Sequence, residues 1–200
     1  MALRTAFRSG TSAKAVAALA MTAAALLAAP GAAGAATGAD GGPAGFAAQA
    51  RAAGLDGAQA KGLQKRVDSY LAKEAGTQVA ANKITLAGGG EILLALPGEK
   101  YARELGTSQP TAATAAANCA YTYVCAYSGT WFSGDKKSFY TCNTLNSIPW
   151  SGTGSWINNQ RPELRARFYD VNKNVGWISP GGYSEDGEAP WGWVYYLSPC

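Results

Sequence analysis

The sequence contains no histidine among its 200 residues. This absence excludes Ser-His and Cys-His nucleophile pairs, and it excludes catalytic metals held by imidazole. Paired carboxylates could still support hydrolysis, as they do in glycosidases. The acidic residues between 118 and 200 lie mostly beside Gly and Pro, however, where solvated surface acids are expected. The composition therefore predicts a protein that is not an enzyme and that uses no cofactor.

Charged residues are few, at 15% of the chain, and the excess of positive charge lies at the beginning. Arg4, Arg8 and Lys14 are three of the 17 Lys and Arg residues, whereas residues 1–36 hold no Asp or Glu. The rest of the chain therefore has 14 basic residues against 13 acidic ones. A nearly neutral chain lacks the basic surface that binds nucleic acid or an anionic membrane, and we expect neither partner.

The long apolar run near the start is too short to span a bilayer, which takes roughly 20 residues. It covers residues 15–30, is interrupted only by Thr22, and leads into the small residues 31–36. Residues 33–35 have the A-x-A form of a cleavage site. We predict that residues 1–36 are a secretory signal peptide and that the mature protein is extracellular.

Cysteine is absent before residue 119, and the four cysteines are Cys119, Cys125, Cys142 and Cys200. An oxidising compartment would join them in two disulfides, for which three pairings exist. We expect Cys119 and Cys125 to close a short local loop, leaving Cys142 to tie down the last residue of the chain. A zinc finger is not expected, because the spacing is wrong and no histidine completes the ligand set.

Tryptophan is absent before residue 131, which divides the chain by composition. Residues 37–105 predict a small α+β segment, made of a helix and a β-hairpin. Residues 106–117 are small and uncharged and predict a flexible linker. Residues 118–200 are rich in aromatic and β-branched residues and predict an all-β module. The sequence leaves open whether residues 37–105 act as a pro-segment, a docking element or a spacer.

Apolar periodicity places a helix in the first segment, from Asp56 to Gly76. Four apolar residues share one face of this helix: Leu63, Val67, Tyr70 and Leu71. Residues 78–86 and 91–96 then predict the two strands of a hairpin, with glycines in the connection at 87–90.

In the second segment, short β-prone runs alternate with Gly, Pro, Asn and Asp, as is typical of a sandwich of short strands. The runs are residues 124–127, 137–140, 155–158, 166–169, 176–178 and 193–197.

An aromatic and glycine spacing occurs twice in this segment. Tyr127 is followed by Phe132 and Gly134, and 42 residues later Tyr169 is followed by Gly176 at the same distance, with Asn in place of the second aromatic. A tyrosine ring can pack on a folded hairpin whose turn needs glycine. The spacing indicates an internal duplication.

This pattern resembles the Greek-key signature of the βγ-crystallin superfamily. The Asn-Cys-(5)-Cys-x-Tyr opening at 118–127 is similar to that of the actinobacterial secreted metalloproteinase-inhibitor family, and residues 150–159 resemble its third-strand region. The resemblance covers about 80 residues. It implies a Greek-key β-sandwich over 118–200 that inhibits a metalloproteinase through exposed loops.

The sequence departs from these families at two places. Many crystallin-type domains bind calcium through acidic or amide residues just before a Ser-Ser-like pair, but here residues 150–151 are Trp-Ser and the pair at 154–155 is Gly-Ser. Calcium needs several hard oxygen ligands, so we expect no metal site. The second short disulfide loop of the founding inhibitor is also missing, because no cysteine lies between Cys142 and Cys200.

The tryptophans are the candidate binding residues. Trp131, Trp191 and Trp193 lie near glycine or proline, where a loop-borne indole can anchor an interface or stack on a sugar. Trp156 and Trp177 lie in strand-like surroundings and are predicted to be core residues. The acidic residues at 185–188 predict a solvated loop.

The leading hypothesis is a secreted, monomeric peptidase inhibitor that inserts an exposed loop into an extracellular protease. The candidate loops are 128–133, 143–154 and 180–190. The alternative is an antimicrobial, toxin-like module that binds cell-wall polysaccharide or a cell envelope. A third hypothesis is an extracellular structural protein.

Overall fold

The computed structural model describes residues 42–200. The predicted signal peptide lies outside the described residues. Within 42–200, no helix is long and apolar enough to cross a membrane. The elements, in chain order, are α1 (Pro43–Ala52), α2 (Gly57–Leu71), β1 (Gly76–Ala80), β2 (Lys83–Leu86), β3 (Glu91–Leu93), α3 (Ala112–Ala117), β4 (Tyr123–Tyr127), β5 (Lys136–Phe139), β6 (Asn146–Ser147), β7 (Thr153–Asn159), β8 (Arg167–Tyr169), β9 (Val175–Ile178), β10 (Ser184–Pro190), the 3-10 turn η1 (Trp191–Trp193) and β11 (Tyr196–Ser198).

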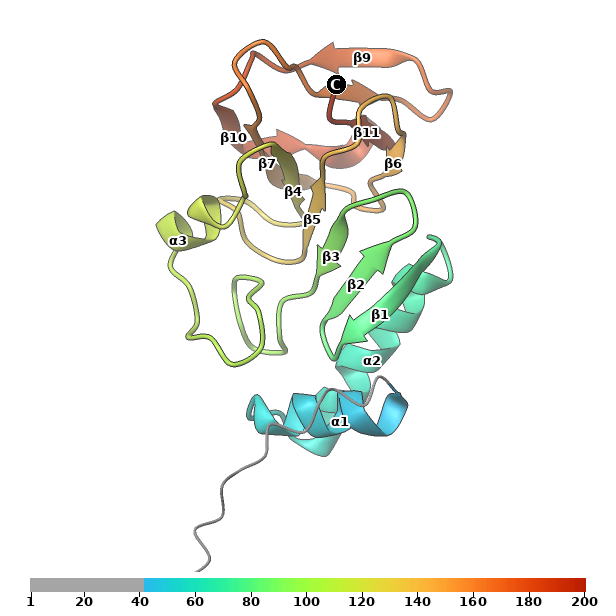
Figure 1. The fold of residues 1–200 in the computed structure, drawn as a ribbon, viewed down its shortest axis with the longest axis vertical. Helices are drawn as coiled ribbons and strands as arrows, with labels where there is room; N and C mark the ends of the chain where they lie inside the picture. Colours follow the sequence, from blue (N-terminus) through green and yellow to red (C-terminus); the bar gives the residue numbers. More distant parts are fainter. Residues whose placement is uncertain (1–41) are drawn as a thin grey trace, which may run out of the picture. The chain divides into compact units, whose positions relative to one another are not determined.

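Two antiparallel sheets make up most of the structure (Figure 1). The larger sheet has the order β1-β2-β3-β5-β4-β7-β10, and the smaller has the order β6-β11-β8-β9. Trp156 of the larger sheet packs edge-on against Phe168 of the smaller, with ring centroids 5.5 Å apart. The predicted β-sandwich is thus confirmed as a pair of packed sheets, to which few helices are added.

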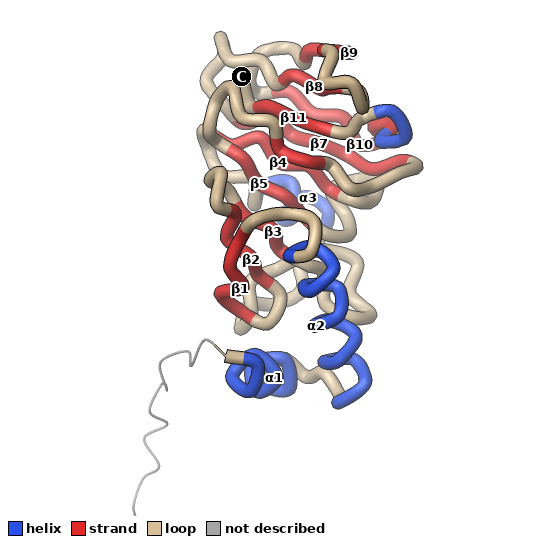
Figure 2. The backbone as a smooth tube through the Cα atoms, turned by 90° about the vertical axis from the view of Figure 1, so that its right-hand side faces the viewer, coloured by secondary structure: helices blue, strands red, loops and turns tan. Residues whose placement is uncertain are grey.

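The helix predicted after Asp56 is present as α2. The Asp56 carboxylate accepts hydrogen bonds from the backbone N–H groups of Ala58 and Gln59, which caps the helix. The predicted end at Gly76 is wrong: α2 ends at Leu71, and Gly76 begins β1, because its backbone is extended and pairs with β2. Figure 2 shows α2 lying alongside β1–β3.

Two further details of the first segment differ from the prediction. Residues 78–86 are not one strand, because the chain turns at Ala81 and Asn82 and divides the run between β1 and β2. The Asn82 side chain holds this turn by donating to the carbonyls of Leu94 and Arg103 at 2.9 Å. Helix α1 was not predicted, because Phe46 is its only large apolar residue.

Strand β3 joins the first segment directly to the second. It pairs with β5, so that Ile92 lies opposite Lys137 in the ladder. Residues 42–200 lie within one compact unit. Within the segment predicted as a linker, residues 112–117 form α3, and the buried Ala115 carbonyl accepts a hydrogen bond from the Tyr127 hydroxyl at 3.2 Å.

The two halves of the sandwich have matching strand pairings. In the larger sheet the hairpin β4–β5 lies next to β7. In the smaller sheet the corresponding hairpin β8–β9 lies next to β11. The remaining strands cross over: β10 joins the larger sheet and β6 joins the smaller. Adding four to the numbers of β5, β4 and β7 gives β9, β8 and β11, which is their order in the smaller sheet. Strand β6 lies beside β11 there, as β10 lies beside β7 in the larger sheet. The predicted duplication is therefore matched in the strand order.

The first copy of the repeated motif has the expected local geometry. Tyr127 is buried and packs edge-on against Phe132 at 5.5 Å, and Gly134 has a φ angle of 77°. In the second copy, the turn after Tyr169 is held by Asp170, whose carboxylate accepts the backbone N–H groups of Asn172 and Asn174. An Asp-capped turn thus replaces the packed aromatic of the first copy.

Five of the six predicted strands are present, with ends shifted by one or two residues. The sixth, residues 193–197, is wrong in its first half, because Trp193 ends η1 and the strand begins at Tyr196. Strands β6 and β10 were missed. Strand β10 was predicted to be a solvated loop, but it pairs with β7 at the edge of the larger sheet, where one side can carry polar residues.

Both predicted disulfides are present. Cys119 is bonded to Cys125, and Cys142 is bonded to Cys200. The second bridge ties the chain end to the loop before β6, where the N–H of Asn143 also donates to the Cys200 carbonyl at 2.9 Å.

Candidate functional site

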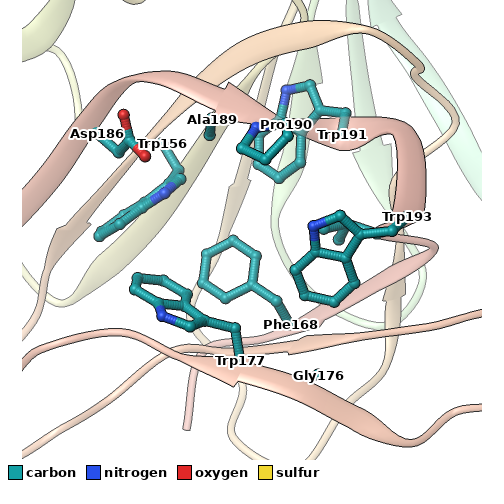
Figure 3. Close-up of a pocket in the computed structure, with 10 residues that line it drawn as sticks. Trp156, Phe168, Gly176, Trp177, Asp186, Ala189, Pro190, Trp191 and Trp193 are labelled. Carbon is teal, nitrogen blue, oxygen red and sulfur yellow. The ribbon is translucent and has the colours of Figure 1, made fainter.

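An aromatic cleft opens between the two sheets, at the side where β9 and β10 form their free edges. Its volume is about 370 Å³, at the lower end of the range for ligand pockets. Figure 3 shows the indole rings of Trp177 and Trp193 on either side of Phe168. The side chains that shape the cleft are Trp156, Phe168, Trp177, Asp186, Trp191 and Trp193.

The floor of the aromatic cleft is rigid. Trp156, Phe168 and Trp191 are each no more than 3% exposed. The Trp191 indole N–H donates to the Tyr127 carbonyl at 2.8 Å, which fixes that ring to β4. The rings of Phe168 and Trp191 stack with centroids 6.2 Å apart. Because the floor is packed and hydrogen-bonded, it needs no rearrangement to receive a ligand.

The walls of the aromatic cleft are partly open to solvent. Trp177 is 41% exposed and Trp193 is 37% exposed. Trp193 rests directly on the backbone of Gly176, where an added Cβ would lie 2.3 Å from the Trp193 ring. Gly176, which the sequence motif singles out, is thus needed for this close approach rather than for a positive φ angle.

The indole N–H donors on these walls have no partner among residues 42–200. No described residue accepts a hydrogen bond from the indole N–H of Trp177 or Trp193, whereas Trp150 and Trp191 both have such a partner. An indole N–H is a donor only, and it normally finds an acceptor when it is covered. The walls therefore offer apolar faces together with free donors.

Asp186 is the one charged residue that lines the aromatic cleft. It lies opposite Trp156 in the β7–β10 ladder and therefore shares a face of the sheet with that ring (Figure 3). One carboxylate oxygen accepts the Glu188 backbone N–H at 2.8 Å. None of the described Lys and Arg side chains forms an ion pair with Asp186. The carboxylate is thus a free acceptor beside the rings.

A third exposed tryptophan lies outside the aromatic cleft, on the loop of residues 128–133. Trp131 is 55% exposed, its backbone N–H donates to the Gly187 carbonyl at 2.8 Å, and its ring packs on Gly187. The next N–H, of Phe132, donates to the Ser155 hydroxyl at 2.9 Å. Trp131 and Phe132 both have positive φ angles, of 51° and 62°. Main-chain bonds hold this loop without a disulfide.

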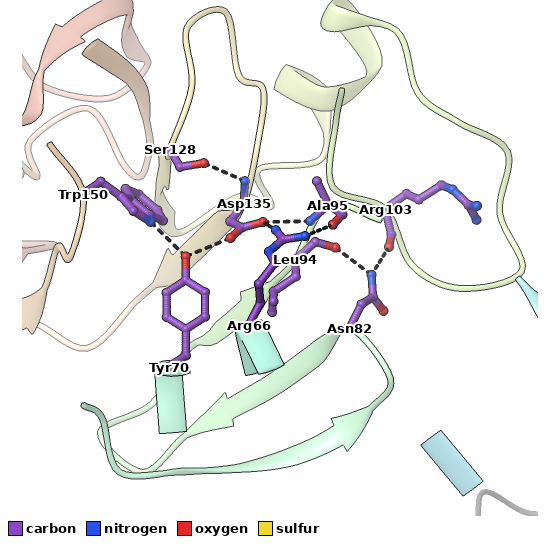
Figure 4. A network of polar contacts seen from close by, with 9 residues as sticks. All are labelled: Arg66, Tyr70, Asn82, Leu94, Ala95, Arg103, Ser128, Asp135 and Trp150. Atoms are coloured by element: carbon purple, nitrogen blue, oxygen red, sulfur yellow. Dashed lines mark hydrogen bonds and ion pairs between the residues drawn. The ribbon is translucent and has the colours of Figure 1, made fainter. Parts of the chain in front are cut away.

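A buried polar network lies elsewhere, where α2 meets the sandwich (Figure 4). Asp135 accepts hydrogen bonds from Arg66, from the Tyr70 hydroxyl and from the Ala95 N–H. The Trp150 indole N–H donates to the Tyr70 hydroxyl at 2.9 Å. Burial, followed by the negative charge of Asp135, raises the pKa of Tyr70. The network borders a hollow of about 200 Å³, smaller than the aromatic cleft, and its polar groups are paired with one another.

The same junction contains a buried lysine. The Lys137 side chain is fully buried and forms an ion pair with Glu74, and its ammonium group also donates to the Ser147 carbonyl at 2.8 Å. Burial lowers the pKa of Lys137 to about 8, although the charge of Glu74 and the hydrogen bond to it act in the opposite direction. The charge is therefore compensated within the chain.

The three tryptophans predicted as binding residues lie at two places. Trp193 lines the aromatic cleft, Trp191 lies in its floor at 1% exposure, and Trp131 lies on the separate loop. Trp177, predicted to be a core residue, is instead a wall of the cleft. Sequence reasoning missed Asp186 because it placed residues 185–188 in a loop.

No group of three or more His, Cys, Asp or Glu side chains suited to holding a metal ion is found within residues 42–200. Comparison with protein-family models, with curated proteins and with solved structures found no match. The chemistry of the aromatic cleft is therefore the basis for a functional proposal.

Proposed function

We propose that this chain is a secreted, non-catalytic binding protein that receives a glycan in the aromatic cleft. The observation that carries this proposal is the pair of exposed indoles, Trp177 and Trp193, standing over a rigid aromatic floor. The C–H face of a pyranose ring is apolar and slightly positive, so it stacks well on the negative face of an indole. Its hydroxyl groups point outward from the ring edge.

The polar groups of the aromatic cleft suit such a ligand. The free indole N–H groups can donate to ring and hydroxyl oxygens, and the Asp186 carboxylate can accept from hydroxyl groups. A purely apolar ligand would leave these groups without partners, at a cost of roughly 1–3 kcal/mol each. A phosphorylated ligand would be repelled by Asp186. A glycan satisfies both the faces and the donors.

The strand order of residues 118–200 supports a proposal about their fold. In each half of the sandwich a hairpin lies beside a later strand, and one strand crosses to the opposite sheet. This exchange supports the proposal that residues 118–200 form a Greek-key sandwich of the crystallin type. Two disulfides within these residues support the proposal of an extracellular location.

The test is a binding assay on the intact, oxidised chain with insoluble peptidoglycan, chitin and cellulose. Retention of the chain on at least one polymer is expected, and Trp177→Ala should weaken it at least tenfold. The matched control is Trp131→Ala, which removes an exposed indole that does not line the aromatic cleft. Equal retention of both variants, or no retention of the unaltered chain, would contradict the proposal.

Peptidase inhibition is a second candidate function, and the loop of residues 128–133 favours it. The resemblance of residues 118–127 to secreted metalloproteinase inhibitors is joined here by an exposed Trp131 on a loop held by main-chain bonds. A preformed loop can enter a protease cleft with little loss of entropy.

Titration of the intact chain against a thermolysin-type metalloprotease tests this second function. Stoichiometric inhibition that Trp131→Ala removes, and that Trp177→Ala retains, would assign inhibition to the loop. Absence of inhibition at micromolar protein would exclude it.

A further inference from the structure

We infer that the aromatic cleft prefers a glycan that carries a free amine, with Asp186 receiving the ammonium group. This inference rests on the proposed function, because it names the class of sugar that the same site selects. The class is that of amino sugars without an acetyl group, such as β-linked glucosamine.

Asp186 occupies an unusual position for a charged residue. It faces the space between the sheets, opposite Trp156 in the ladder. Strand positions facing the inside of a sandwich normally carry apolar side chains. Among the residues that line the aromatic cleft, Asp186 is thus a single carboxylate placed in an aromatic surrounding.

The negative charge of Asp186 has no cationic partner within residues 42–200. By comparison, the buried carboxylate of Asp135 forms an ion pair with Arg66. Asp186 receives only a backbone N–H. A partly covered carboxylate is stabilised by an opposite charge, and a bound ammonium group would supply it.

The rings around Asp186 favour the same charge. Trp156 and Trp177 lie with their centroids 5.4 Å apart, and their faces carry negative partial charge. A cation within about 6 Å of an indole face is attracted to it, and the attraction grows when water is excluded. An amine next to a stacked pyranose ring would meet both the indoles and the carboxylate.

Selectivity follows because a sugar without the amine lacks the positive charge that the indole faces and Asp186 attract. An N-acetyl group keeps the amide N–H but loses the positive charge, and a hydroxyl group has neither. The same aromatic faces would still stack on all three sugar rings. We therefore expect the neutral sugars to bind more weakly than the amine, and not to be rejected.

The experiment measures the affinity of the intact chain for three hexasaccharides by calorimetry, at about pH 5, where the amines of a glucosamine oligomer are protonated. The probes are hexamers of β-1,4-linked glucosamine, N-acetylglucosamine and glucose. The expected result is at least tenfold tighter binding of the glucosamine hexamer than of the other two. Asp186→Asn should abolish this preference, so that the glucosamine hexamer binds no more tightly to the variant than the two neutral hexamers do.

The control is Glu188→Gln, which changes the net charge equally but alters an exposed residue that does not line the aromatic cleft. It should retain the preference. Asn at position 186 keeps an oxygen that can accept the Glu188 N–H, so a melting temperature equal to that of the unaltered chain should accompany the loss.

Each other outcome has a distinct meaning. Equal binding of all three hexamers overturns the amine preference and leaves the glycan proposal standing. A preference that survives in Asp186→Asn, or that Glu188→Gln removes equally, overturns the role of Asp186. If the chain binds none of the hexamers and none of the polymers, the glycan proposal itself is overturned.

Discussion

At the scale of single residues, two glycines with similar backbone angles have different surroundings. Gly134 has a φ angle of 77°, and an added Cβ would lie 2.2 Å from the Ser128 hydroxyl oxygen. Gly152 has a φ angle of 80°, and an added Cβ would meet no atom within 4 Å. Both positions strain an L-residue, but only Gly134 is also crowded.

Substitution by alanine should separate these two effects. Gly152→Ala is expected to lower the free energy of unfolding by about 1–2 kcal/mol through backbone strain alone. Gly134→Ala should lower it by about 3 kcal/mol, because overlap with Ser128 adds to the strain. Urea denaturation measures both, and equal losses would contradict the account of the β4–β5 hairpin.

The sequence could predict Gly134 but not the roles of the tryptophans. The spacing from Tyr127 to Gly134 is local, and a local turn explains it. Whether Trp177 is buried depends on which strands form the sheet edges, and residues distant in the sequence decide this. Trp191 looked loop-borne for the same reason, although η1 buries it in the cleft floor.

At the scale of secondary-structure elements, the buried Lys137 on β5 predicts a dependence of stability on pH. Its pKa is about 8 in the folded chain, against an ordinary value of 10.5. Below pH 8 the lysine is charged in both folded and unfolded chains, so the folded chain bears the full cost of burial. Between these pKa values the unfolded chain binds more protons, and stability rises with pH.

Lys137→Met isolates this contribution from other titrations. Relative to that variant, the unaltered chain should gain up to about 3 kcal/mol in its free energy of unfolding between pH 8 and pH 10.5. Chemical denaturation at several pH values measures the difference. A difference that stays constant, or that falls as the pH rises, would show that burial does not control this lysine.

The pairing of β3 with β5 predicts how an isolated sandwich would behave. A fragment of residues 118–200 lacks Glu74, Arg66 and β3, so Lys137 and Asp135 lose their partners and the β5 edge opens. Breaking a buried pair costs about 3–5 kcal/mol, and open edges promote association. Size-exclusion chromatography and urea denaturation should show a less stable, self-associating fragment. A monomeric fragment as stable as the whole chain would contradict this.

Elements with a strong local signal could be predicted, and elements that depend on partners could not. Helix α2 was found from its apolar face and its Asp56 cap. Strand β10 was missed, because at the edge of a sheet one of its sides is solvated and its sequence is polar. The pairing of β3 with β5 joins residues about 45 positions apart, and no local pattern reports it.

At the scale of the whole molecule, the matching strand orders explain why one cleft is open. The aromatic cleft lies between β9 and β10, and the corresponding place in the other half lies between β5 and β6. There Lys137 of β5 reaches the Ser147 carbonyl of β6, and Glu74 and Tyr70 from the first segment cover the site. The first segment therefore fills one of two related openings. The other opening, the aromatic cleft, is uncovered.

The most direct test of the aromatic cleft as the binding site is a nuclear magnetic resonance titration that follows the six indole N–H signals as glucosamine hexamer is added. We expect the signals of Trp177 and Trp193 to move in proportion to occupancy, while those of Trp131 and Trp150 stay in place. Movement confined to Trp131, or no movement at a concentration that saturates binding, would contradict it.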